Sequence, residues 1–359
     1  MSSKLPAASS ILKQADIESK QFISIDRSME KKVYNWGILA PGNIARKFAT
    51  ELQQLDNARV YAVGSRNADR SKEFADAYGA ERHYNNYEDL VSDPDVDIIY
   101  IASPHGLHAE HALLCLNHQK PVLCEKALAL NQKEVDKMMA CARENGVFLM
   151  EAFFTPHQPS YKEAKRIIES GELGKVKYIQ GWFGFNKSPY DNSLRLMNPK
   201  LGGGALLDIG LYPVFDSLYF LGEPDQIVAK ADFAETGVDQ SVSIRFDYSD
   251  GVSASIFASF VAASGLGTDI FCEYGTLQLR RTSAVNQSLV IERQGAEIKR
   301  DSWDDQAVGG MKLEAAEAMK CLDENRLESE IMPHSMSLSL IKTLDLIRHK
   351  AEIIYPERD

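Results

Sequence analysis

The chain has 359 residues, of which 44% are hydrophobic and 25% charged, proportions that are ordinary for a globular protein. This length exceeds what one hydrophobic core usually organises, so we expect two domains. The formal net charge of −11 argues against nucleic acid and membrane surfaces as partners, and no run approaches the about 18 to 20 apolar residues that span a bilayer.

The first 32 residues differ from the rest of the chain because they are rich in Ser, Lys and Gln, with only scattered apolar residues. They lack the apolar core of a secretory signal. We interpret residues 1–32 as an N-terminal arm that is disordered or loosely docked. The alternative is an arm that reaches across to another subunit.

Five cysteines are present, an odd number without C-x-x-C spacing. This usage favours free thiols in a reducing compartment over a disulfide framework or a zinc site. We therefore expect a cytoplasmic protein without a metal site.

Residues 33–152 alternate between predicted strands and helices. Asn131, with Glu134 three residues later, is typical of a capped helix start. Strands separated by helices of this length indicate βαβ units, so we expect an α/β Rossmann domain with a parallel sheet. The strands are expected at 33–39, 59–64, 96–102, 121–124 and 147–150, and the helices at 43–55, 68–78, 108–118 and from Asn131 onward.

The turn after the first strand carries Ala40, Gly42, Asn43, Ile44 and Ala45. Dinucleotide-binding folds have the pattern G-x-G-x-x-G/A at this point, so Ala40 replaces the first glycine. Gly42 still allows a pyrophosphate to approach the backbone, and the helix N-terminus beyond it attracts the anion. We predict that Ala40, Gly42, Asn43 and Ile44 bind a dinucleotide; an ordinary tight turn is the alternative.

The second strand ends in Ser65 and Arg66, where NAD-binding folds usually place an acidic residue that holds the ribose hydroxyls. A hydroxyl and a guanidinium suit a 2′-phosphate instead. The sequence therefore favours NADP, with NAD as a second possibility. The alternative interpretation of Arg66 is a surface arginine in a loop.

Residues 153–359 follow a different pattern, in which several strands have mostly hairpin-length spacing. This predicts an α+β domain with an open, mostly antiparallel sheet. Helices are expected at 160–170, 205–221 (behind a flexible glycine triplet at 202–204), 312–324 and 335–349, and strands at 176–185, 226–234, 241–248, 253–260, 268–273, 275–280 and 289–293.

Two clusters carry groups that can transfer a proton. Glu125 and Lys126 directly follow a short apolar strand, and ligands of parallel sheets bind at the carboxyl ends of the strands. Asp208 and Tyr212 are four residues apart, so on a helix they share one face. Together a lysine, an aspartate and a tyrosine can move a proton on and off a hydroxyl group. Ordinary roles are the alternatives: a surface lysine, a core tyrosine and a capping aspartate.

These residues belong to a wider set of motifs: Trp36-Gly37-Ile38-Leu39 with Gly42-x-Ile44-Ala45, Ser65-Arg66, Ser103-Pro104-His105-x-x-His108, Glu125-Lys126, and Gly202-Gly203-Gly204-Ala205-Leu206-x-Asp208-Ile209-Gly210. With this set the chain resembles the glucose-fructose oxidoreductase/inositol dehydrogenase (Gfo/Idh/MocA) family from about residue 34 to the C-terminus. Tyr212, where many members have histidine, resembles the branch of dihydrodiol dehydrogenases, NADP-dependent xylose dehydrogenases and anhydrofructose reductase. The stretch Met150-Glu151-Ala152-Phe153-Phe154 resembles that branch too.

The resemblance implies an NAD(P)-dependent dehydrogenase that acts on a secondary alcohol of a sugar, polyol or trans-dihydrodiol. Tyr212 would be the acid/base, with Lys126 lowering its pKa; alternatively Lys126 itself would carry the proton. Asp208 would orient the lysine or bind a substrate hydroxyl. The resemblance also implies a homodimer or higher oligomer that forms through the C-terminal sheet.

The same resemblance places Ser103, Glu125 and Lys126 beside the cofactor. It places His108 near the nicotinamide or the substrate, and Phe154 near the substrate together with Asp208 and Tyr212. A helix-capping role for His108 and core packing for Phe154 are the alternatives, and His105 is a weaker candidate.

Two positions depart from the family pattern. Ala40 replaces the first glycine of the phosphate turn, and Ala127 replaces the proline that usually follows the lysine, often after a cis bond. The bond after Lys126 is therefore expected to be either trans or cis. Two other functions remain open on this scaffold: a cofactor-binding sensor without catalysis and an NAD-dependent glycosidase.

Overall fold

The computed structural model describes residues 32–186, 191, 194–281, 287–293, 299–303 and 310–356. The chain divides into two units, Met1–Val33 and Tyr34–Asp359. The predicted arm at 1–32 lies outside the described residues except for Lys32, so its interpretation stays a prediction.

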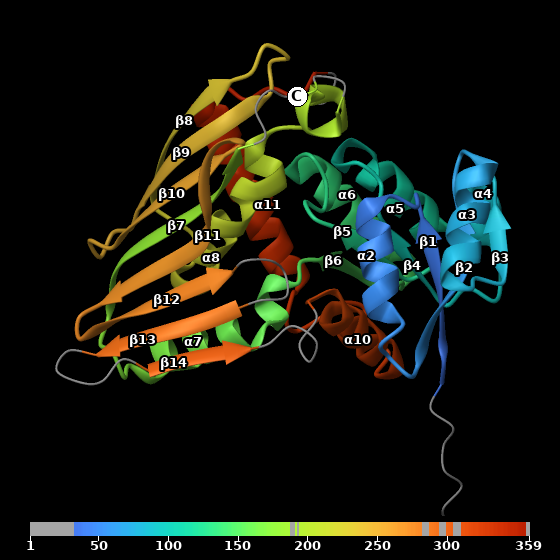
Figure 1. The fold of residues 1–359 in the computed structure, drawn as a ribbon, viewed down its shortest axis with the longest axis horizontal. Helices are drawn as coiled ribbons and strands as arrows, with labels where there is room; N and C mark the ends of the chain where they lie inside the picture. The colour runs from blue at the N-terminus through green and yellow to red at the C-terminus, as the bar shows by residue number, and fades with distance from the viewer. Residues whose placement is uncertain are drawn as a thin grey trace, which may run out of the picture. The chain divides into compact units, whose positions relative to one another are not determined.

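A six-stranded sheet forms the N-terminal half, in the order β3-β2-β1-β4-β5-β6, with every pair of neighbours parallel (Figure 1). The predicted Rossmann architecture is confirmed. The strand order reverses between β1 and β4, and ligands of open α/β sheets bind at such a point. The strands are β1 (Tyr34–Leu39), β2 (Ala58–Gly64), β3 (Arg82–Tyr84), β4 (Ile98–Ile101), β5 (Val122–Glu125) and β6 (Leu149–Ala152); the helices are α2 (Asn43–Leu52), α3 (Ala68–Tyr78), α4 (Tyr87–Ser92), α5 (His108–Asn117) and α6 (Gln132–Asn145).

Local sequence signals account for most of these elements. All four residues of β4, β5 and β6 are buried, as expected for strands covered on both faces. The side chain of Asn131 caps α6 by accepting a hydrogen bond from Glu134 N at 2.9 Å. The prediction missed β3 and α4, which have three and six residues and are too short to leave a periodic pattern.

An eight-stranded sheet forms the C-terminal half, in the order β14-β13-β12-β11-β7-β10-β9-β8. Its neighbours are antiparallel except for β10 and β7, so the expected mostly antiparallel sheet is confirmed. The prediction missed β14, and β11 begins earlier than expected. The strands are β7 (Val176–Asn186), β8 (Gln226–Phe233), β9 (Asp239–Asp247), β10 (Ser253–Ser259), β11 (Val261–Cys272), β12 (Gly275–Arg281), β13 (Gln287–Arg293) and β14 (Lys299–Trp303).

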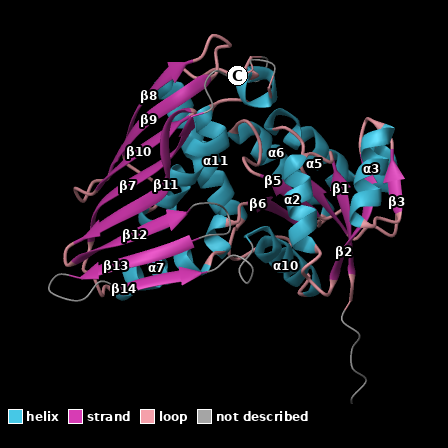
Figure 2. Cartoon of the chain, in the orientation of Figure 1, coloured by secondary structure: helices cyan, strands magenta, loops and turns pink. Residues whose placement is uncertain are grey.

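Helices cover one face of this sheet (Figure 2). The helices α7 (Pro159–Ser170), α8 (Leu211–Leu221) and α11 (His334–Ala351) pack against its strands. In contrast, α10 (Gly310–Asp323) packs against α2 and β6, and α11 also contacts α6. The C-terminal helices therefore contribute to the core of the first half as well as the second.

The glycine triplet before the π-helical turn η5 (Leu206–Gly210) is closely packed. Gly204 has a φ of +119°, and a Cβ added there would lie 2.0 Å from Oδ1 of Asp239. Oδ2 of Asp239 accepts a hydrogen bond of 2.6 Å from Leu206 N, so this carboxylate caps the start of the helix. A Cβ on Gly203 would lie 2.5 Å from the carbonyl oxygen of Leu196. The expectation of a flexible triplet is therefore corrected, because these glycines make room for their neighbours.

One described segment, Pro199–Leu221, is long and apolar enough to cross a membrane by length and composition alone. This corrects the expectation that no run approaches that threshold. The segment is 78% buried inside the protein and contains η5 and α8, so its apolar residues are those of a core helix.

We predict that Gly204→Ala destabilises the protein by about 3 kcal/mol or more, because the new Cβ would displace the capping carboxylate of Asp239 and strain the backbone. The matched control is Gly171→Ala. Gly171 has a φ of +71° but no atom within 4 Å of the added Cβ, so only the backbone cost of about 1 kcal/mol applies. Urea unfolding measures both, and equal losses would contradict the proposed role of Asp239.

Candidate active site

Lys126 directly follows β5, at the carboxyl edge of the parallel sheet. Its Nζ donates a hydrogen bond of 2.6 Å to the backbone carbonyl of Asp208 and lies 3.7 Å from Asp208 Oδ1. The peptide bond between Lys126 and Ala127 is cis, which answers the question that the sequence left open. The ammonium group is thus held by a residue of the C-terminal half.

Asp208 lies in η5, which continues directly into α8. The helix predicted at 205–221 is present, but its first part is π-helical, a local form that often marks functional sites. Oδ1 of Asp208 also accepts a hydrogen bond of 3.0 Å from Arg195 Nη2. One carboxylate therefore faces two cations, Lys126 and Arg195.

Tyr212 lies in the first turn of α8, with 8% of its surface exposed. Lys126 Nζ is 5.1 Å from the centroid of its ring, a distance at which cation–π attraction operates. The rings of Phe153, Phe154 and Phe183 pack around it, with centroids 5.3, 5.8 and 5.8 Å away. Among the residues that the structure describes, none hydrogen-bonds the Tyr212 hydroxyl.

Burial holds Tyr212, and the surrounding charges hold Lys126, in the protonated form at neutral pH. Burial raises the pKa of Tyr212, and the opposing effect of Lys126 does not cancel this rise. Burial lowers the pKa of Lys126, but the surrounding Tyr212, Asp208 and Glu125 outweigh burial and leave the pKa above its ordinary value. The resting site therefore has a proton to donate.

The cations Lys126 and Arg195 also lower the pKa values of Asp208 and His105. Burial raises the pKa of Asp208, but Lys126 and Arg195 outweigh it and lower the pKa to about 2. Burial, with Arg195 and Lys126 adding to it, lowers the pKa of His105 to about 3. His105 is therefore neutral at pH 7, with Nδ1 2.9 Å from the carbonyl oxygen of Gly202.

A cavity of about 880 Å³ joins these groups to the turn after β1. Every residue predicted to bind the cofactor lines it, as do the three predicted catalytic residues. The lining comprises Ala40, Pro41, Gly42, Asn43, Ile44, Lys47, Ser65, Arg66, Asn67, Arg70, Tyr87, Ala102, Ser103, Pro104, His105, Glu125, Lys126, Phe183, Phe185, Arg195, Leu196, Asp208, Ile209 and Tyr212.

The turn between β1 and α2 fits a bound pyrophosphate. The N-terminus of α2 has no side-chain cap and no acidic residue in its first turn, so its N–H groups are free to donate hydrogen bonds to an anion. A Cβ on Gly42 would meet only the carbonyl oxygen of Ala40, at 4.0 Å, which leaves open space above this position. Ala40 has a φ of +66°, a conformation that glycine adopts more readily, and this explains why a glycine is usual there.

The far end of the cavity is positively charged. Arg66, Arg70 and Lys47 line it, and no acidic side chain is among the described residues of the lining at that end. Ser65 is buried, and its Oγ accepts a hydrogen bond of 3.2 Å from Asn67 N, which organises the turn after β2. These residues fit a phosphate on the adenosine ribose better than free ribose hydroxyls.

Glu125 and Ser103 form part of the wall between the two ends. Tyr100 donates a hydrogen bond to Oε1 of Glu125, and the backbone N–H of Lys126 lies 3.2 Å from Oε2. Oγ of Ser103 lies 2.9 Å from Nδ1 of His111. Both side chains are therefore oriented by buried neighbours.

The structure places His108 and Phe154 behind the cavity lining. His108 is fully buried, and its two ring nitrogens lie 2.8 Å from the carbonyl oxygens of Ala127 and Ser103. Burial lowers the pKa of His108 to about 4, and a neutral imidazole can donate to only one of these oxygens. The position suits a residue that holds the chain beside Lys126, while His105, the weaker candidate, lines the cavity.

The comparisons with known proteins agree with this geometry. Residues 34–153 match the family model described as "Oxidoreductase family, NAD-binding Rossmann fold", and residues 161–278 match that of the GFO/IDH/MocA C-terminal domain. The chain belongs to the Gfo/Idh/MocA oxidoreductase family.

Curated relatives in this family match nearly the whole chain. The trans-1,2-dihydrobenzene-1,2-diol dehydrogenase of Xenopus laevis is 34% identical over 331 residues, which cover 89% of this chain and 99% of that protein. The human enzyme of the same name is 33% identical over 332 residues, covering 90% and 98%.

Solved structures are similar over the same length. KijD10, a 3-ketoreductase from Actinomadura kijaniata in complex with NADP and TDP-benzene, has a TM-score of 0.80 and 27% identity, covering 89% of this chain and 98% of that chain. An aldose-aldose oxidoreductase from Caulobacter crescentus has a TM-score of 0.81 with the same coverage, but at 21% identity it shows the shared fold alone.

Several lining residues of this Gfo/Idh/MocA protein were not predicted from its sequence. Arg195, Phe183 and Phe185 come from β7 and the segment beyond it, while Lys47 and Arg70 come from α2 and α3. An arginine or lysine on an amphipathic helix has the same pattern whether it faces a cavity or solvent. The sequence therefore held no signal for Lys47 and Arg70.

Proposed function

We propose that this member of the oxidoreductase family transfers hydride between NADP and a secondary alcohol of a sugar, polyol or trans-dihydrodiol, with Tyr212 carrying the proton. One observation carries the proposal: Lys126, Asp208 and Tyr212 meet in the same cavity as the turn that fits a pyrophosphate. NADP, when bound, supplies the hydride acceptor or donor. All other steps belong to side chains of the chain itself.

The proton is assigned to Tyr212 because Lys126 is already engaged. Lys126 Nζ donates to the carbonyl of Asp208 at 2.6 Å, whereas the Tyr212 hydroxyl has no hydrogen-bond partner among the described residues. Lys126 acts as a fixed positive charge that favours the phenolate when the proton leaves. Asp208 keeps the lysine in place, Arg195 holds the carboxylate of Asp208, and both remain available to substrate hydroxyls.

The walls suit a hydroxylated ring with one apolar face. Phe183 and Phe185 offer aromatic surface, and His105, Arg195 and Asp208 offer donors and acceptors. The names of the relatives in Xenopus laevis and Homo sapiens support a cyclic diol, and that of KijD10, a 3-ketoreductase, supports a ketone as the oxidised form of the substrate. NADP is proposed over NAD because Arg66, Arg70 and Lys47 line the far end of the cavity.

Lys126→Ala and Tyr212→Phe should each lower kcat/KM by about 100-fold or more, because each removes a group of the proton-transfer site. Absorbance of the reduced nicotinamide follows the reaction with NADP or NAD and a panel of aldoses, polyols and trans-dihydrodiols. Lys137→Ala, at an exposed position of α6, and Tyr274→Phe, 60% exposed, serve as controls that should retain activity.

The other functions give different results in the same assay. Cofactor binding without reduction by any substrate would support a sensor. Cofactor that stays bound through purification, with glycoside cleavage but no net reduction, would support a glycosidase. Full activity of Tyr212→Phe would assign the proton to Lys126.

Arg66→Ala should raise KM for NADP about 10-fold or more and leave KM for NAD nearly unchanged, because it removes a charged hydrogen-bond donor to phosphate. Initial rates with each cofactor at saturating substrate measure this. Arg59→Ala is the matched control, since Arg59 lies on β2, the strand that leads into Arg66, and forms an ion pair with Glu81. Equal changes for the two cofactors would argue against a 2′-phosphate site.

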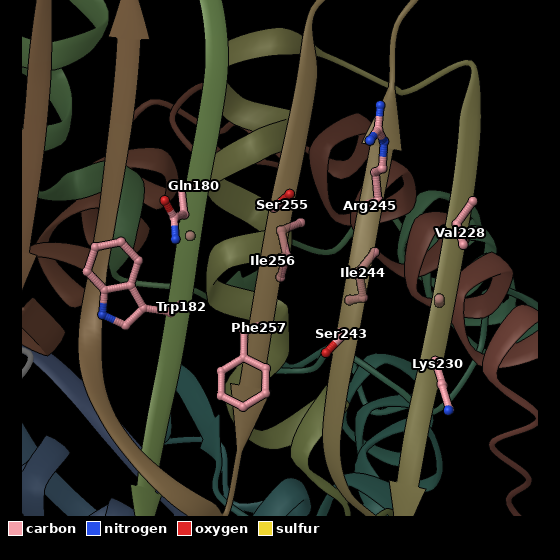
Figure 3. Close-up of a pocket in the computed structure, with 12 residues that line it drawn as sticks. Gln180, Trp182, Val228, Lys230, Ser243, Ile244, Arg245, Ser255, Ile256 and Phe257 are labelled. Atoms are coloured by element: carbon pink, nitrogen blue, oxygen red, sulfur yellow. The ribbon is translucent and has the colours of Figure 1, made fainter.

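We propose further that the uncovered face of the large sheet forms a homodimer or higher oligomer. Figure 3 shows Trp182 on β7, Phe257 on β10 and Val228 on β8, all on this face, which has a hollow of about 440 Å³. Val228 is 62% exposed, and α8 and α11 pack on the opposite face. Apolar side chains spread over several strands, interspersed with polar ones such as Arg245, suit contact with a second copy.

Val228→Asp should shift the protein towards monomer, since it buries a charge if this face pairs with a copy of itself. Ile354→Asp is the matched control, because Ile354 is 64% exposed and lies beyond α11. Light scattering across a dilution series measures the mass. An unchanged oligomer in Val228→Asp, or a monomeric parent protein, would reject the proposed interface.

A reducing location such as the cytoplasm is also proposed. All five cysteines are free thiols, which supports it. Cell fractionation tests it directly.

A further inference from the structure

A buried ion pair lies beside Tyr212, outside the lining of the cavity. Arg281, on β12, and Asp216, on α8, have side chains that are 1% and 0% exposed, and Nη2 of Arg281 lies 3.5 Å from Oδ2 of Asp216. The pair is anchored on three sides. Nη1 of Arg281 donates to Thr155 Oγ1 at 3.1 Å, while the hydroxyls of Tyr161, at 2.8 Å, and Thr268 donate to Asp216.

The guanidinium faces the ring of the tyrosine. Cζ of Arg281 lies 5.6 Å from the centroid of Tyr212, and Lys126 Nζ lies 5.1 Å from the same centroid. Tyr212 is therefore within cation–π distance of two cations from different elements. Of these two cations, Lys126 lines the cavity and Arg281 does not. Arg281 can therefore act on the reaction through the tyrosine but not through direct contact with substrate.

Stability alone gives little reason for this pair. A buried ion pair costs so much desolvation that apolar residues of similar volume often serve as well or better. Arg281 and Asp216 nevertheless occupy the core directly behind the residue proposed to carry the proton. Asp216 lies four residues after Tyr212 on α8, so both side chains are aligned by the same helix.

We propose that Arg281 is a positioning residue that stabilises the deprotonated form of Tyr212 from behind the cavity, with Asp216 holding it there and moderating its charge. This inference rests on the proposed function only for its consequence in catalysis. The charged groups that face Tyr212 are Lys126 and Arg281, which favour the phenolate, and Glu125 and Asp208, which oppose it. Burial raises the pKa of Tyr212, and Lys126 and Arg281 together limit the rise.

Substitutions of the two members of the pair should shift the pKa of Tyr212 in opposite directions. In Arg281→Met a cation is lost, so the pKa of Tyr212 should rise, by about one unit or more. In Asp216→Asn the guanidinium loses its counter-charge, so the pKa should fall, while the amide can still pair with Tyr161 and Thr268. Arg281→Lys retains a cation and should stay near the parent value. A purely structural role would move both single variants in the same direction.

The measurement is a titration of a difluorotyrosine placed at position 212 and followed by fluorine NMR, in the full-length protein without substrate. Fluorination brings the titration of the phenol towards neutral pH, and a single label needs no assignment. If Arg281→Met does not fold, the double variant Arg281→Met/Asp216→Asn leaves no unpaired buried charge and should still raise the pKa. No rise in either, or shifts of Arg281→Met and Asp216→Asn in one direction, would overturn the inference.

Activity separates this inference from the proposed function. In the unlabelled variants, the limb of the kcat/KM pH profile that reports Tyr212 should move as the NMR titration does, with KM for NADP unchanged. Predicted NMR shifts in a protein that reduces neither cofactor would uphold the role of Arg281 and reject the dehydrogenase. Activity with NADP but no NMR shift would uphold the dehydrogenase and reject the role of Arg281.

Discussion

The contact between the Lys126 ammonium and the backbone carbonyl of Asp208 joins residues that are 82 positions apart and come from different halves of the chain. A buried lysine is costly unless its charge is compensated and its donors are used. Here the carbonyl takes one donor, and the carboxylate of the same residue lies 3.7 Å away. The position of η5, and hence of Tyr212 on the helix that follows, is coupled to the end of β5 through this one side chain.

The surrounding structure supports that contact from several directions. Close packing of the glycine triplet against Leu196 and the carboxylate of Asp239 places the first turn of η5. On the other side, the imidazole of His108 holds the carbonyl of Ala127, the residue after the lysine. Neither the glycine triplet nor His108 lines the cavity, yet both help to set the positions of Lys126 and Tyr212. Precise placement of this kind is the main contribution a protein makes to hydride transfer by a bound cofactor.

The histidine pair illustrates why motif reasoning stops short of geometry. His105 and His108 are three residues apart, one in η1 (His105–Leu107) and the other at the start of α5. Their rings meet edge to face at 5.6 Å, so a small difference in direction decides which one reaches the cavity. The helix start turns His108 into the core and leaves His105 beside Arg195 and Asp208. The spacing in the sequence is compatible with either outcome.

The sequence by itself determined the two architectures, the cofactor turn and the three groups proposed for proton transfer. Those features rest on local patterns: alternating strand and helix periods, a glycine before a helix, and a lysine at the end of an apolar strand. Only the tertiary structure decided that Asp208 meets Lys126, that Arg195 joins them, and that Arg281 and Asp216 lie behind Tyr212. These contacts bring together residues that are far apart in the chain, through packing that depends on both sheets at once, so no local pattern encodes them.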